Sequence, residues 1–141
     1  LEKGQLEQSK KHVSSLLERD PTFAGAAQLL EEIELRLWKE TLPLSFLARH
    51  NHRIGDCTGR LRFHDWGLEY RSSEHGVWRW PFDEIRTMER PSQWRFEMET
   101  YESELLSMGR PKSYKFSLRD APLTDEDWLR FRKLAEEARL P

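Results

Sequence analysis

The spacing of apolar residues changes near residue 42. Residues 4–19 and 22–40 carry apolar side chains at three- and four-residue steps, which predicts two amphipathic helices. Asp20-Pro21 separates them, because proline disfavours helical geometry in the preceding residue and suits the first turn of a new helix. From Leu42 onward apolar and polar residues alternate, which predicts strands. We therefore expect two parts, residues 1–41 and residues 42–141.

The second part contains six or seven short alternating segments with turn residues between them. Leu61 and Phe63, for example, alternate with arginines, as expected for an antiparallel strand with one face in water. Thr124 precedes three acidic residues and an amphipathic stretch, a typical helix start. The order predicts an α+β fold in which a helical hairpin precedes a seven-stranded antiparallel barrel or sandwich capped by a C-terminal helix.

Four further expectations concern single positions or short segments. Residues 83–88 are expected to form a short strand, and Trp94 is expected to share a buried face with Phe96 and Met98. Leu129 is expected on the apolar side of the C-terminal helix. Pro81 suits an edge position, because proline cannot donate a ladder hydrogen bond.

Two resemblances follow from these segments. Residues 16–26, with their Asp-Pro step and small residues, resemble the helix junction of a tetratricopeptide array, which implies a scaffold. Residues 43–139, with Thr58–Phe63, Gly67–Tyr70, the run Trp80–Ile85 and a tryptophan in the terminal helix, resemble pleckstrin-homology-like (PH/GRAM-like) domains. That resemblance implies that Trp128 is a structural plug of the barrel, whose loss should unfold the domain.

The charge and cysteine content narrow the expected partners and compartment. The net charge is −2, and residues 41–141 carry 17 basic and 17 acidic side chains, so we expect no nucleic-acid partner. Cys57 is the single cysteine, which excludes an intramolecular disulfide and favours a reducing, cytoplasmic compartment. A helix pattern already under way at Leu1 indicates a piece of a longer protein. The oligomeric state is left open.

Protein or peptide recognition is the function that we expect first. Pleckstrin-homology-like barrels accept extended peptides along a sheet edge or beside the terminal helix. Trp78 and Trp80 share one face of their strand and are candidate interface anchors, if they do not pack within the molecule.

Binding of anionic lipid is the alternative. The resemblance places basic residues of the first two strands at the lipid site, and the matching residues here are Arg49, Arg53, Arg60 and Arg62. Arginine suits phosphate because its guanidinium donates two parallel hydrogen bonds. Against this, the two strands have no lysine and Asp56 lies in their loop.

A metal-binding or thiol enzyme is the remaining alternative. His50 and His52 would share a strand face with Cys57 nearby, and His64 and His75 lie further along, but no standard zinc spacing is present. No catalytic motif appears either. We therefore expect a non-enzymatic module without catalytic residues, bound metal or cofactor.

Overall fold

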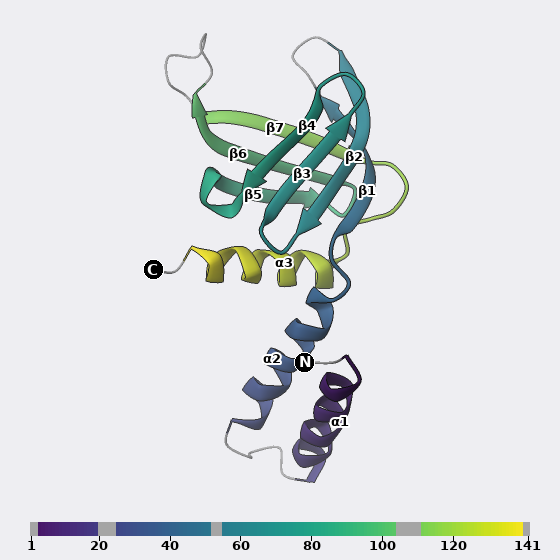
Figure 1. The fold of residues 1–141 in the computed structure, drawn as a ribbon, viewed down its shortest axis with the longest axis vertical. Helices are drawn as coiled ribbons and strands as arrows, with labels where there is room; N and C mark the ends of the chain where they lie inside the picture. The colour runs from purple at the N-terminus through teal and green to yellow at the C-terminus, as the bar shows by residue number, and fades with distance from the viewer. Residues whose placement is uncertain (1–2, 20–24, 52–54, 104–110, 140–141) are drawn as a thin grey trace. The chain divides into compact units, whose positions relative to one another are not determined.

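The structure is a computed structural model that describes residues 3–19, 25–51, 55–103 and 111–139. The chain divides into two compact units, Leu1–Leu42 and Pro43–Pro141. The first holds two helices, and the second holds seven antiparallel strands in a half-barrel with a C-terminal helix (Figure 1). This arrangement confirms the expected α+β class. No helix among the described residues is long and apolar enough to cross a membrane.

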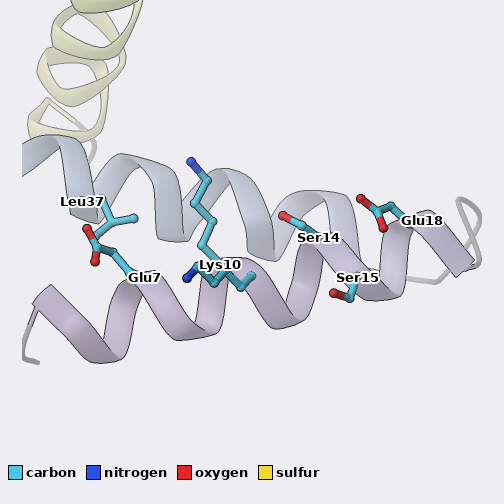
Figure 2. A pocket seen from close by; sticks show the side chains of 7 residues that line it. Glu7, Lys10, Ser14, Ser15, Glu18 and Leu37 are labelled. Atoms are coloured by element: carbon cyan, nitrogen blue, oxygen red, sulfur yellow. The ribbon is translucent and has the colours of Figure 1, made fainter.

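The N-terminal unit is a pair of helices, α1 (Lys3–Arg19) and α2 (Ala26–Lys39). Val13, Ala26 and Ile33 form its buried core. Gly25 precedes α2 with φ 79°, a conformation that glycine adopts without strain. Residues 20–24, which include the Asp-Pro step of the tetratricopeptide-like junction, lie outside the described residues. Figure 2 shows a groove along α1 whose lining is polar except for Leu37.

The second unit is built on one sheet with the strand order β4-β3-β2-β1-β7-β6-β5. Every strand pairs antiparallel to its neighbours, and the two edge strands are β4 and β5. The strands are β1 (Leu44–Asn51), β2 (Asp56–His64), β3 (Gly67–Ser72), β4 (Gly76–Pro81), β5 (Ile85–Ser92), β6 (Arg95–Ser103) and β7 (Pro111–Leu118).

Small residues allow the sheet to curl. Ala48 of β1 pairs with Gly59 of β2, which pairs in turn with Ser72 of β3. A Cβ atom on Gly59 would collide with the carbonyl oxygen of Arg71, so only glycine permits this approach of the two strands. The apolar side chains at every second position of the strands then pack together on the inner face of the curled sheet. Leu61, Phe63 and Phe116 are almost completely buried there.

The C-terminal helix α3 (Asp125–Ala138) lies across one end of the half-barrel (Figure 1). The hydroxyl of Thr124 accepts a hydrogen bond from the Asp127 N–H at 3.2 Å, which caps the helix as its sequence indicated. Phe131 is fully buried, with ring centroids 4.8 Å from Phe63 and 5.3 Å from Phe82. Trp128 is also buried, although less completely. The helix therefore closes this end with apolar side chains.

Three details differ from the sequence-based expectations. Residues 82–84 form a short 3-10 helix, η1 (Phe82–Glu84), and the following strand β5 begins at Ile85. Trp94 is 46% exposed because it lies in the turn between β5 and β6 rather than in the strand. Leu129 is 54% exposed because the helix turns only its other apolar side chains toward the sheet.

Candidate functional site

The outer face of the half-barrel collects the arginines of strands β1 to β4. Arg49, Arg60 and Arg62 occupy outward positions of β1 and β2. Strand register adds Arg71 and Arg79, because residues paired across an antiparallel ladder share one face of the sheet. Arg53 lies outside the described residues. Three of the four candidate arginines therefore share a face with two arginines that the sequence analysis did not select.

The centre of this face is a buried carboxylate, that of Glu69. Its side chain is only 6% exposed. The Arg62 Nη1 donates a hydrogen bond to it at 3.2 Å and the Arg79 Nε donates one at 3.3 Å from the two adjacent strands. Arg71 Nη2 lies 3.8 Å from the same carboxylate. Three positive charges surround one negative charge, so the group keeps a net positive charge and many unused N–H donors. We call Arg62, Glu69, Arg71 and Arg79 the arginine cluster.

The other two outward arginines pair with carboxylates of their own. Arg49 Nε lies 3.4 Å from Asp56, and Arg60 donates to Asp120 at 3.0 Å. Asp120 also accepts a hydrogen bond from the Leu47 N–H. Desolvation alone would raise the pKa of Asp120, but these two hydrogen bonds, together with its own backbone N–H and the charge of Arg60, lower the pKa below its usual value. Exposed pairs of this kind contribute little stability and exchange readily.

His64 lies beside the arginine cluster at the end of β2. Its ring stacks on that of Trp66 at 4.7 Å, and its Nε2 is 4.0 Å from the Glu69 carboxylate. Burial lowers the pKa of His64 below its usual value, and the neighbouring guanidinium of Arg62 lowers it further, against the opposite effect of Glu69. His64 is therefore neutral near pH 7.

The two candidate tryptophan anchors face the inside of the half-barrel. Trp80 is buried at 3% exposure, and its Nε1 donates to Glu102 at 3.3 Å, so it is not available as a surface anchor. Trp78 is half-buried and stacks on His75 with centroids 4.5 Å apart. Their strand, β4, pairs only with β3 among the described strands, so its other edge keeps its backbone N–H and C=O groups unpaired within the sheet.

The last residues of β1 and β3 and the first residues of β2 and β4 lie at the end of the half-barrel opposite α3 (Figure 1), and this end carries a second group of polar side chains. His50 and Cys57 face each other across β1 and β2, with the Sγ 3.8 Å from the Nδ1. His75 comes from the turn between β3 and β4, where its backbone N–H donates to the Ser72 hydroxyl at 3.0 Å. The ligand atoms of His50, Cys57 and His75 all lie within 4.8 Å of one another.

Aromatic rings surround His50 and leave little of it in contact with solvent. The centroid of His50 is 5.2 to 5.7 Å from the rings of four residues, which are Tyr70, Trp78, Tyr114 and Phe116. His50 and Cys57 are each 7% exposed. The Tyr70 hydroxyl is 3.2 Å from the Cys57 Sγ. Lys112 extends over the ring of Tyr114 at 5.2 Å, within the range of a cation–π contact.

Burial decides the protonation of this group. It raises the pKa of the Cys57 thiol above its usual value, and the opposing hydrogen bond with Tyr70 does not cancel the effect. Burial likewise raises the pKa of the Tyr70 hydroxyl. Both side chains are therefore neutral near pH 7, and the thiol is not an activated nucleophile.

Both groups of side chains are brought together by contacts between strands and turns rather than by spacing along the sequence. His50 and Cys57 come together because they pair across a hairpin, and His75 joins them from a separate turn. His52 lies outside the described residues. The arginine cluster depends on the register of three strands, which alternation alone does not specify. Arg71 and Arg79 could have been found only by aligning β3 and β4 on the turn at Gly76.

Comparisons with known proteins do not assign the chain to a family. No model of a protein family matches the sequence, and no curated protein matches it. Solved structures include similar folds, among them the C-terminal domain of an unknown protein from Leishmania infantum. That domain is 14% identical, with a TM-score of 0.46, over 68% of this chain and 84% of the other. The function is therefore argued from the geometry of the chain itself.

Proposed function

We propose that residues 43–139 form a non-enzymatic, pleckstrin-homology-like recognition module that binds an acidic, extended peptide segment of a protein partner along the edge of β4. The observation that carries the proposal is the arginine cluster, in which three guanidiniums surround one buried carboxylate beside an edge strand. A cytoplasmic location agrees with the single, buried Cys57.

The edge strand supplies the main-chain part of such binding. An added strand would pair with the backbone groups of β4 between Gly76 and Pro81, which supplies affinity without sequence preference. Pro81 lacks an N–H and marks the end of the available ladder. The bound segment would thus extend over about the length of β4.

Side chains on the two faces of β4 define which peptide fits. Peptide side chains that point outward beside Arg79 would meet the arginine cluster. Arg71 and Arg79 are its most exposed arginines, with side chains 52% and 57% exposed. Peptide side chains that point inward would lie beside the half-buried ring of Trp78. Since side chains alternate along a strand, the peptide best suited to this edge alternates acidic and apolar residues.

The buried carboxylate prepares the arginines for binding. Glu69 holds Arg62 and Arg79 by hydrogen bonds from neighbouring strands, so part of the side-chain entropy of these arginines is lost on folding rather than on binding. The net positive charge that remains would attract an acidic segment and speed its association at low salt. High salt should weaken the complex, because the contacts are at the surface.

Fluorescence anisotropy with a labelled peptide of alternating glutamate and valine tests the proposal. We expect saturable binding by the unmodified chain that weakens as salt is added. The double variant Arg71→Glu and Arg79→Glu should lose about tenfold or more in affinity, because both exposed guanidiniums become repulsive. Amide hydrogen exchange should slow in β4 when the peptide is bound.

Two controls make the result specific. Arg95→Glu reverses an exposed arginine on β6, away from the cluster, and should leave the affinity unchanged. A peptide in which lysine replaces glutamate should not bind. If the double variant binds the acidic peptide as tightly as the unmodified chain does, the proposal is wrong. Binding of phosphatidylserine vesicles without binding of the peptide would instead identify the arginine cluster as a lipid site and overturn it.

A further inference from the structure

We infer that His50, Cys57 and His75 form a site for one divalent transition-metal ion of the zinc type. The inference does not rest on the proposed peptide binding. Its three ligands lie at the end of the half-barrel opposite α3, although Trp78, which would border the peptide, also stacks on His75. The inference rests on three potential ligands that come from separate elements of the fold and converge on one point.

The spacing of the ligand atoms fits a tetrahedral ion. Zinc binds thiolate sulfur at about 2.3 Å and imidazole nitrogen at about 2.0 Å, which places two such ligands about 3.6 Å apart. The Cys57 Sγ and His50 Nδ1 are 3.8 Å apart, and the full set with His75 spans at most 4.8 Å. A small movement of the turn that carries His75 would close the remaining distance.

The backbone holds two of the ligands in place. His50 and Cys57 are directly opposite in the register of β1 and β2, so the pairing of these strands fixes their separation. The turn at His75 is held by its hydrogen bond to Ser72, itself a buried residue at the end of β3. A metal site needs this kind of support from strand geometry and surrounding hydrogen bonds.

The surroundings also suit a bound cation. The Tyr70 hydroxyl donates to the Cys57 carbonyl oxygen at 3.2 Å and also lies 3.2 Å from the Sγ, so rotation of its one O–H would let it donate to a metal-bound thiolate instead. The aromatic rings around His50 help to leave it and Cys57 only 7% exposed, and low exposure strengthens charge interactions at these two ligands. A thiolate and two neutral imidazoles favour zinc or cobalt over the oxygen-preferring magnesium and calcium.

Three protein ligands leave one tetrahedral position for an outside group. Structural zinc sites in proteins usually have four protein ligands, whereas sites with three accept water or a ligand molecule in the fourth position. The class of ligand implied is therefore a small donor that binds zinc directly, such as water or an anion. His75 has the most exposed of the three side chains, at 27%, and marks the side from which such a molecule would enter.

Titration with cobalt(II) under reducing conditions tests the site in the 141-residue chain purified without a histidine tag. We expect one cobalt per chain, a near-ultraviolet thiolate-to-cobalt charge-transfer band and strong visible bands typical of tetrahedral coordination. Added zinc should displace the cobalt and raise the melting temperature. Element analysis after dialysis should find one zinc per chain.

Variants of the proposed ligands distinguish a preformed metal site from adventitious binding of cobalt to the thiol. Cys57→Ser should abolish the charge-transfer band, and His75→Ala should weaken cobalt binding by at least about tenfold while leaving the circular dichroism spectrum unchanged. His12→Ala removes an exposed histidine of α1 and should change nothing. Failure of the unmodified chain to show the band, or equal cobalt affinity in His75→Ala, would overturn the inference.

Discussion

The two ends of the half-barrel are built from the same strands but differ in chemistry. Under α3 the side chains are aromatic and apolar, with Phe131 against Phe63 and Phe82. At the opposite end, two histidines and a cysteine lie among tyrosine and tryptophan rings. The first end is closed mainly by packed aromatic and aliphatic side chains, whereas the second buries the imidazole of His50 and the thiol of Cys57 among its rings. A difference of this kind separates residues kept for packing from residues available for binding.

The largest expected effect lies at the end under α3. Phe131→Ala should lower the free energy of unfolding by about 3–5 kcal/mol, because it removes a fully buried ring and leaves a cavity. Trp128→Ala should cost somewhat less, since Trp128 keeps 9% exposure and its ring lies 6.0 Å from that of Phe96. Urea denaturation measures both values. Leu129→Ala, in the same helix but 54% exposed, should stay within about 0.5 kcal/mol and serves as the control.

The next prediction concerns thiol reactivity at the opposite end. With chelator present, Cys57 should react with iodoacetamide at least about tenfold more slowly in the folded chain than in urea, because burial restricts access and raises the thiol pKa. The rate should increase as the pH rises toward that pKa, since only the thiolate reacts. Mass spectrometry follows the modification. Equal rates in folded and unfolded chain would show that this end is open.

A smaller effect is expected when the polar character of that end is removed. His50→Phe should change the free energy of unfolding by less than about 1 kcal/mol in the presence of chelator, because a similar ring still fits among four aromatic neighbours. The same variant should lose cobalt binding. A loss of several kcal/mol without metal would mean that His50 is part of the packing and that the two ends are not distinct.

The smallest expected effect is the contribution of His64 to the pH dependence of stability. His64 lies on the outer face of the sheet, near the end that α3 covers. Its pKa is lowered on folding, so the unfolded chain binds more protons and stability should fall as the pH drops from about 6.5 through the lower pKa of the folded state. Above about pH 6.5 His64 is neutral in both states, and this loss of stability is absent. His64→Gln should flatten this part of the profile, as thermal unfolding at several pH values would show. An unchanged slope would assign the pH dependence to another group.

Some features of the site could be predicted from sequence and others could not. Alternation grouped Arg60 with Arg62 on one face of their strand and Trp78 with Trp80 on one face of theirs, because period-two alternation needs only the local chain. Whether a face is covered depends on other strands. Trp80 is buried because Tyr114 of β7 packs on it at 4.8 Å, a contact between residues far apart in the sequence. Trp94 shows the opposite case, since the turn ahead of β6 carries it into solvent.

The sequence by itself determined the order of helices and strands in this protein, because helix and strand periods, helix caps and turns are properties of neighbouring residues. It specified the α+β order and the terminal helix with its Thr124 cap. The tertiary structure alone decided which side chains meet. Glu69 gathers arginines from three strands, and His75 joins His50 and Cys57 from a different turn. Such groupings depend on strand register and on the curl of the sheet, which are set by packing across the whole domain.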